Sequence, residues 1–156
     1  MFTAREMKDG LAGYPTGVVL VAASHAGKAV GMLANSFTSV SLDPPLVSLA
    51  FARTSTTWPL LQHAGRWGIS VLSQQHAECL PLLTRATDVR FDGITTIERH
   101  GGLVLPDASV TLTVTRHAEI DAGDHVLTLL RVLDLHRDVD APSLVLYDRA
   151  ARRIAG

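Results

Sequence analysis

The chain has 156 residues, of which 47% are hydrophobic and 19% charged, and its formal net charge is -1. This length favours a single domain over residues 1–156, and the apolar content excludes a disordered chain, a collagen and a bare coiled coil. The near-zero net charge argues against a nucleic acid or an anionic membrane as partner, because both bind through basic surfaces.

The cysteine count and the apolar runs indicate where the protein works. A single cysteine, Cys79, cannot form an internal disulfide, which argues against a secreted, disulfide-stapled scaffold. No apolar run reaches the roughly 18 residues of a membrane span, and residues 1–10 show no basic-then-apolar leader. We therefore expect a cytoplasmic protein that does not associate with membranes.

The first third of the chain shows the spacing of one helix and three strands. Thr3 and Glu6 have the spacing of a capping box, which predicts a helix over 3–11. Turn residues at 24–27 separate two β-branched runs and predict a hairpin. Asp43-Pro44-Pro45 argues against regular pairing, so residues 35–41 are predicted to form a polar loop. The predicted strands cover residues 17–23, 28–34 and 46–52.

The remainder of the chain shows more strands than helices. Ser55 or Thr56 is a suitable cap for a helix that ends before Gly65, and residues 76–83 predict another helix with Pro81 early in it or bending it. Residues 85–102 lack periodicity and are predicted to be a loop, and 149–153 to be a basic tail. Apolar residues alternate with threonines over 110–115, which is typical of a strand with one face in water. Further strands are predicted over 67–72, 125–135 and 143–147.

The element order predicts the class of fold. Strands with short connections and brief helices favour a mainly β, closed or nearly closed antiparallel barrel over alternating βαβ units. The usual glycine-rich dinucleotide, triphosphate and hydrolase motifs are absent. His76 and Cys79 have a spacing that suits one metal ion, but no second pair has ligand spacing, so we predict no metal site. The alternative for this pair is a buried cysteine beside an exposed histidine.

One segment points to a family. Residues 31–47 read G-M-L-A-N-S-F-T-S-V-S-L-D-P-P-L-V. This run resembles the short-chain flavin reductases, the reductase components of two-component flavin-dependent monooxygenases. The resemblance extends from about Leu11 to Tyr147, through residues 53–57, 91–93, 122–125 and 144–147. It implies an FMN-binding split barrel with Greek-key antiparallel strands, and a homodimer with flavin near its interface. It also implies reduction of FMN or FAD by NADH or NADPH, in the service of a partner monooxygenase.

The residues themselves suit a flavin. An isoalloxazine ring needs an apolar cradle with amide and hydroxyl donors at its polar edge, and Met32–Ser36 supplies both. Arg53 and the hydroxyls after it, with the N-terminus of the next helix, suit a phosphate. The alternatives are an ordinary hydroxyl-rich turn at 36–41 and an ordinary N-cap at Ser55. The predicted cofactor-binding residues are Met32, Leu33, Ala34, Asn35, Ser36, Ser39, Val40, Ser41, Ala52, Arg53, Ser55, Thr56, Thr57, Phe91 and Tyr147.

His125 matches a histidine that contacts the nicotinamide in the family. The resemblance implies that His125 positions the nicotinamide for hydride transfer, and the alternative is a histidine that caps a turn. For Tyr147 the alternative is an aromatic residue at a barrel edge. Three positions depart from the pattern: Leu33 replaces a threonine, 110–115 lacks a tryptophan and a cysteine, and no Gly-Arg-Tyr follows Tyr147. A flavin-binding barrel without nicotinamide turnover, or a binding or dimerisation module, are the rival functions.

Overall fold

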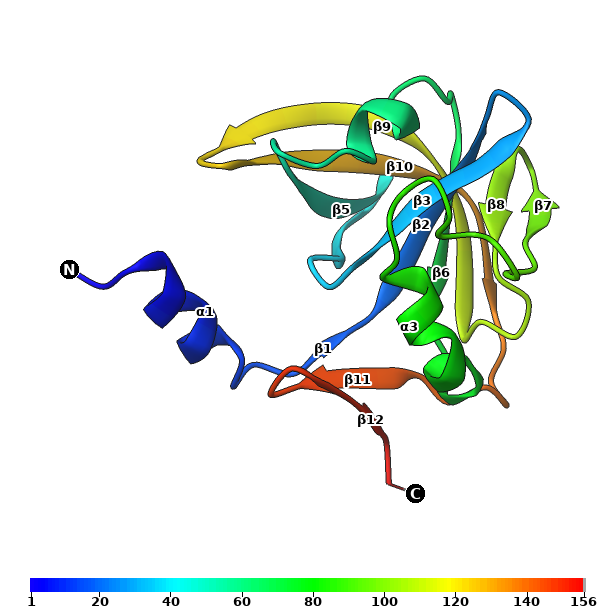
Figure 1. The fold of residues 1–156 in the computed structure, drawn as a ribbon. Helices are drawn as coiled ribbons and strands as arrows, with labels where there is room; N and C mark the ends of the chain where they lie inside the picture. The colour runs from blue at the N-terminus through cyan, green and yellow to red at the C-terminus, as the bar shows by residue number, and fades with distance from the viewer. Residues whose placement is uncertain (156) are drawn as a thin grey trace.

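A seven-stranded antiparallel sheet forms the body of the protein in this computed structural model, which describes residues 1–155 (Figure 1). The strand order is β3-β2-β6-β9-β10-β5-β4. The bounds are β2 Val19–His25, β3 Lys28–Ala34, β4 Thr38–Leu42, β5 Pro45–Ala52, β6 Trp67–Val71, β9 Val110–Ala122 and β10 His125–Arg137.

Smaller elements flank this sheet. β1 (Thr16–Gly17), β11 (Leu144–Tyr147) and β12 (Ala150–Arg153) form a three-stranded sheet, and β7 (Ile97–Arg99) pairs with β8 (Gly102–Val104). The helices are α1 (Ala4–Leu11), α2 (Trp58–Leu61), the 3-10 helix η1 (Gln74–Cys79) and α3 (Leu80–Leu83). The strands pair antiparallel and the helices are short, which confirms the predicted mainly β class. Within residues 1–155, no helix combines the length and the apolar character that a membrane crossing needs.

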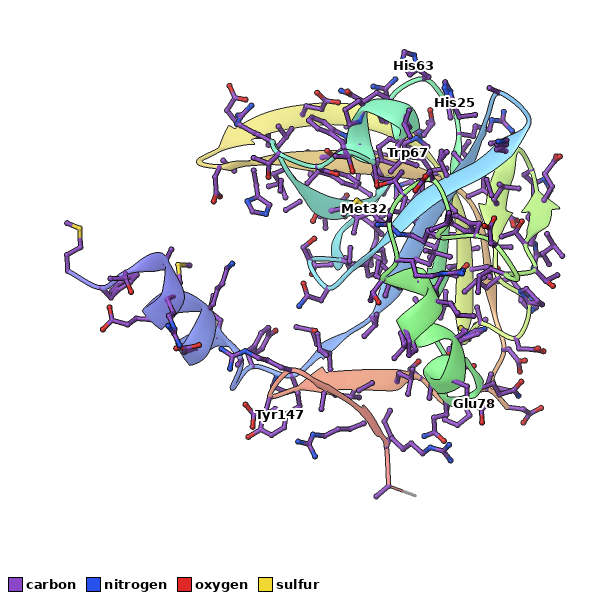
Figure 2. All side chains as sticks on the ribbon, in the orientation of Figure 1. His25, Met32, His63, Trp67, Glu78 and Tyr147 are labelled. Atoms are coloured by element: carbon purple, nitrogen blue, oxygen red, sulfur yellow. The ribbon has the colours of Figure 1, made fainter. Side chains whose placement is uncertain are left out.

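Strand β2 is buried on both faces and separates two apolar clusters. Successive side chains of a strand point to opposite faces. Val19 and Val21 therefore pack in one cluster with Phe51 and Trp67 (Trp67 is labelled in Figure 2), while Leu20 packs in the other. In the first cluster the Phe51 and Trp67 rings meet edge to face at 5.6 Å between centroids, an arrangement that contributes about 0.5–1.5 kcal/mol.

The prediction of a polar loop over 35–41 is wrong for its second half, because Thr38–Leu42 forms β4. Ser39 pairs with Val47 and Leu42 pairs with Pro45. The prolines are compatible with this hairpin because Pro44 lies in the turn and Pro45 is the first residue of β5. A proline is tolerated at the first residue of a strand. β4 is also an edge strand, so only one of its sides needs backbone partners.

The predicted loop over 85–102 is wrong at its end, where β7 and β8 form a hairpin against β6. A Cβ atom on Gly68 would collide with the backbone of Leu103, so the two strands lie backbone against backbone. The hairpin also covers the threonines of β9. Thr113 Oγ1 donates to the Arg99 carbonyl at 2.7 Å, and Thr113 and Thr111 are both buried. The predicted wet face of this strand is therefore dry at these two positions.

The two ends of the chain differ from each other in how well the sequence predicted them. The capping box of Thr3 and Glu6 is present, and α1 ends at Leu11 as predicted. The predicted basic tail is wrong, because 150–153 forms β12 and pairs with β11. The two turn residues, Asp148 and Arg149, have positive φ angles, and neither is the glycine that normally marks such a turn.

The predicted helix from Ser55 to Ala64 is also shorter in the structure, where α2 spans four residues.

Candidate functional site

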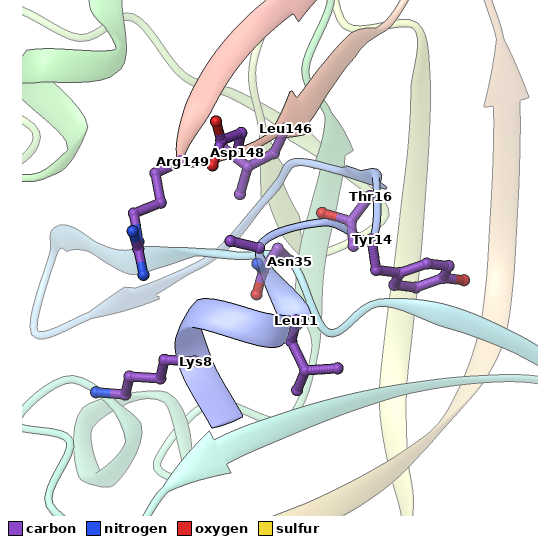
Figure 3. Close-up of a pocket in the computed structure, with 9 residues that line it drawn as sticks. Lys8, Leu11, Tyr14, Thr16, Asn35, Leu146, Asp148 and Arg149 are labelled. Carbon is purple, nitrogen blue, oxygen red and sulfur yellow. The ribbon is translucent and has the colours of Figure 1, made fainter. Parts of the chain in front are cut away.

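A hollow of about 500 Å³ opens beside the end of β3, between α3 and the β11–β12 hairpin. Its walls are mostly apolar and include Leu33, Ala34 and Leu146. A second hollow of about 390 Å³ shares Asn35, Leu146 and Arg149 with the first (Figure 3). Lys8 of α1 and Arg149 of the hairpin turn extend on the same side of this second hollow (Figure 3).

One buried hydroxyl of the second hollow has no partner in the described part of the chain. Thr16 Oγ1 is buried and has no hydrogen-bond partner among residues 1–155, although a buried hydroxyl left unpaired costs about 1–3 kcal/mol. The exposed Asn35 side chain lies between the two hollows. Volumes of a few hundred Å³ with apolar walls and few polar groups are typical of small-molecule sites. The residues present therefore fit a planar aromatic ring with a polar edge, such as that of a flavin.

The predicted cradle Met32–Ser36 divides between these hollows and the core. Leu33, Ala34 and Asn35 line the larger hollow. Met32 is directed to the face of β3 opposite Leu33, where it packs with Ala34 against the first apolar cluster. Ser36 Oγ accepts from the Ala50 N–H at 3.0 Å, so this hydroxyl fastens the segment to β5.

The predicted residues of β4 lie apart from both hollows. Ser39 and Ser41 pair with β5, and the bulge between them leaves Val40 48% exposed on an edge strand. None of the three lines the hollows described above. Phe91 packs against the second apolar cluster. Tyr147 is 43% exposed, with the Arg152 guanidinium 5.5 Å from its ring centroid, and it also lies outside both linings.

Arg53 and His125 lie together at the start of β10. The Arg53 guanidinium donates to Asp121 Oδ1 at 2.6 Å and to the Gly123 carbonyl at 3.2 Å. His125 lies opposite Ala52 in the β5–β10 pairing, and its Nδ1 is 2.7 Å from Asp124 Oδ1. The bond and the charge of His125 lower the pKa of the Asp124 carboxyl below its ordinary value. His125 is thus held by its neighbour and lies outside the linings of the two hollows.

Ser55 holds the turn that leads into the short helix α2. Its Oγ accepts from the N–H groups of Thr57 and Trp58 at 3.2 and 3.1 Å and donates to Met32 Sδ at 3.7 Å. The N-cap residue of α2 is Thr57, whose own side chain makes no capping bond, so the alternative of an ordinary N-cap at Ser55 is wrong in position. A direct contact of Ser55 with phosphate stays a prediction, but its hydroxyl already bonds the first amide of the helix, that of Trp58.

Arg90 links the predicted phosphate segment to the predicted cradle, and the sequence reasoning missed it. Its Nη1 donates to the Gly31 carbonyl at 2.6 Å and to Thr57 Oγ1 at 3.0 Å. Its Nε donates to the Arg85 carbonyl at 3.0 Å. Partial burial lowers the pKa of this guanidinium, which still stays charged. The one signal in the sequence was its position directly before the matched segment 91–93.

His76 and Cys79 use their polar atoms within the protein. His76 Nδ1 accepts from the Ser73 N–H at 3.0 Å, and Nε2 lies 2.8 Å from the Pro106 carbonyl. His76 is buried and Cys79 half-buried, which reverses the exposure that the alternative for this pair assumed. Burial raises the pKa of the Cys79 thiol. No group of three or more metal-ligating side chains occurs in the described part of the chain.

Comparisons with known proteins identify the family. The family model described as "Flavin reductase like domain" matches residues 11–155. A probable flavin reductase of Rhizobium meliloti is 37% identical over 134 residues, which are 85% of this chain and 43% of that protein. The reductase component of 4-hydroxyphenylacetate 3-monooxygenase from Thermus thermophilus is 32% identical, with 94% of each chain covered.

A solved structure shows the same fold with ligands. The NADH:FAD oxidoreductase of Streptomyces globisporus C-1027, in complex with NAD and FAD fragments, superposes with a TM-score of 0.89 at 25% identity. The superposition covers 97% of this chain and 92% of that one. The predicted split-barrel fold is thereby confirmed. Since the family model matches nearly the whole sequence, this chain belongs to the flavin reductase-like domain family.

Proposed function

We propose that this protein is an NAD(P)H:flavin oxidoreductase that reduces FMN or FAD and supplies the reduced flavin to a partner monooxygenase. The observation that carries the proposal is the family match over residues 11–155, which contain the walls of the larger hollow. The Thermus relative named as a monooxygenase reductase component supports the partner. The Streptomyces relative named as an NADH:FAD oxidoreductase supports the nicotinamide donor.

The chain contributes binding and orientation to this reaction. Flavin, when bound, supplies the hydride-accepting chemistry. Leu33 and Leu146 would form apolar walls against the ring, and the exposed Asn35 amide would hydrogen-bond to its polar edge. Within the segment Arg53–Thr57, the exposed Arg53 and Thr56 side chains would meet the phosphate, whereas the Ser55 and Thr57 hydroxyls bond within the protein. A flavin held in this way would let the nicotinamide stack at near-attack distance, which is about 3–3.5 Å.

His125 positions the nicotinamide in this proposal. The Asp124 carboxylate fixes the orientation of the imidazole through Nδ1, which leaves Nε2 to contact the substrate. The role is one of orientation, because hydride transfer needs alignment of two rings more than it needs a proton.

The active form is a homodimer in this proposal. None of the residues of α1 is buried, and the helix projects beyond the barrel (Figure 1). Phe2, Met7 and Leu11 are exposed on or beside it, and apolar residues grouped in this way mark surfaces for partners. Light scattering after size exclusion would then give twice the 16.7 kDa of one chain, with residues 1–156 behaving as one domain. The single thiol, Cys79, is compatible with a cytoplasmic location.

An anaerobic spectrum tests the activity. The purified protein is mixed with FMN or FAD, and NADH or NADPH is then added. Catalytic bleaching of the flavin absorbance is expected, and the traces rank the flavins and the two nicotinamides. Flavin that binds but stays oxidised would contradict the reductase and leave a flavin-binding barrel without nicotinamide turnover. If neither flavin binds, the site itself is wrong.

A further inference from the structure

A chain of three threonine hydroxyls leads from the interior to the surface beside α2. Thr57 Oγ1 lies 3.1 Å from Thr87 Oγ1, and Thr87 Oγ1 lies 3.0 Å from Thr56 Oγ1. Thr57 is only 2% exposed, Thr87 is half-buried, and Thr56 is exposed. The buried end of the chain meets Arg90, and the exposed end belongs to the segment proposed to bind phosphate.

Arg90 sets the direction of the hydrogen bonds along this chain. A guanidinium has donors only, so Thr57 Oγ1 accepts from Arg90. If Thr87 also donated to Thr57, the Thr57 proton would have no acceptor among the residues that the structure describes. An unpaired hydroxyl at a buried site is costly. Thr57 therefore donates to Thr87. We assign Thr87 as the donor to Thr56, because Thr87 is half-buried and its proton has no other acceptor among residues 1–155, whereas the exposed Thr56 hydroxyl can turn its proton outward.

Hydrogen bonds to groups other than the three threonine hydroxyls fix the position of Arg90. The same Nη1 donates to the Gly31 carbonyl of β3, and Nε donates to the Arg85 carbonyl. Arg85 in turn donates through Nη2 to the carbonyls of Arg90 and Asp92 at 3.0 and 2.6 Å. A planar guanidinium held at several points cannot turn away from Thr57, whereas a lysine ammonium reaches one acceptor at a time with no fixed plane.

We propose that Arg90 and Thr87 are positioning residues for a phosphate group, because together they direct the Thr56 proton outward, where an anion accepts it. The anion is the phosphate monoester or the pyrophosphate of a flavin nucleotide, so this inference rests on the proposed function. Neither Arg90 nor Thr87 contacts the phosphate itself. Hydrogen bonds in such a chain polarise one another, which strengthens the last donor.

Flavin fluorescence titrations of the full-length protein test this role, with FMN and with riboflavin, which lacks the phosphate. Thr87→Val keeps the side-chain shape and removes the middle hydroxyl. We expect its Kd for FMN to rise about tenfold and its Kd for riboflavin to change less than about twofold. Thr87→Ser restores the hydroxyl and is expected to restore FMN binding. Arg90→Lys is expected to weaken FMN selectively in the same way.

Thr115→Val is the matched control, because it makes the same change at a threonine that donates to the Gly65 carbonyl and bonds to none of the three hydroxyls or to Arg90. Any loss that it causes is expected to be equal for FMN and riboflavin. Equal losses for both flavins in Thr87→Val, or no loss for either, overturn the inference. Circular dichroism checks folding, and if Arg90→Lys does not fold, Thr87→Val decides.

The wild-type protein separates the two proposals. If it binds FMN and riboflavin with the same Kd, phosphate is not recognised, and this inference fails while the proposed function stands. If it binds neither flavin, the proposed function fails and this inference fails with it.

Discussion

The two halves of the candidate site differ in polarity and in how their polar groups are paired. The hollows beside the β11–β12 hairpin have apolar walls, and their buried Thr16 hydroxyl has no partner within residues 1–155. Around Ser55, Thr57 and Arg90, by contrast, the polar groups bond to one another. The first region therefore offers a ligand mainly apolar surface, whereas in the second region the polar groups bond to one another and only the Thr56 end is exposed. Substitutions in the first region are expected to weaken binding of the flavin ring, and those in the second to change phosphate recognition or stability.

Leu146→Arg is the strongest way to break the first region. Leu146 lines both hollows, so a guanidinium there places a charge against the proposed ring position. Because a charge without a partner is unfavourable in an apolar site, we expect flavin affinity to fall by about 100-fold or more in a fluorescence titration. Val145→Arg is the control, since Val145 is the neighbour on the opposite face of β11 and lines neither hollow. An equal loss in both variants would place the ring elsewhere.

His125→Ala separates nicotinamide binding from flavin binding. Loss of the imidazole that Asp124 orients should raise the KM for NADH or NADPH by about tenfold, with the KM for flavin nearly unchanged. Steady-state kinetics with each substrate varied in turn measures the difference. Unchanged kinetics would leave His125 as a residue that caps the β9–β10 turn. A rise in the flavin KM alone would move it to the flavin side.

Ser55→Ala tests whether the Ser55 hydroxyl contacts the phosphate or only stabilises the start of α2. The variant loses a hydroxyl that accepts from two N–H groups at the start of α2, so we expect about 1 kcal/mol of destabilisation by chemical denaturation. The ratio of FMN to riboflavin affinity should stay as in the wild type, because the Ser55 hydroxyl already bonds to groups within the protein. A selective loss of FMN affinity would show that Ser55 contacts the phosphate after all.

Local patterns in the sequence predicted local structure well. The capping box at Thr3 and the hairpin of β2 and β3 depend on residues a few positions apart, and both are present. β12 and the β7–β8 hairpin were missed although each strand pairs with its neighbour in the sequence, because the strands are only three or four residues long and show no apolar alternation. The Asp148–Arg149 turn has no glycine, and the glycines near β8 serve close packing against β6.

At the site, the sequence predicted residues within one segment and missed residues that come from other elements. The run from Gly31 placed Leu33, Ala34 and Asn35, which line the larger hollow. Thr16, Thr87 and Arg149 were not predicted in their present roles, since each reaches the site from another element. Arg149 even belongs to the segment predicted as a free tail, yet it pairs with Asp9 of α1. Spacing in one segment does not reveal contacts between segments.

Asp124→Asn should have the smallest effect of these substitutions, a change in thermal stability that depends on pH. The pKa of Asp124 is lowered from its ordinary 3.8, chiefly by the bond to His125 and also by its charge. A carboxyl with a lowered pKa contributes stability that is complete above its unfolded pKa and is lost as pH falls through its folded one. The Tm advantage of the wild type over Asp124→Asn should therefore decline below about pH 3.8. Because the carboxylate is exposed, added salt should reduce this advantage at neutral pH. An advantage that instead grew on acidification would show that the Asp124–His125 bond does not stabilise the folded state.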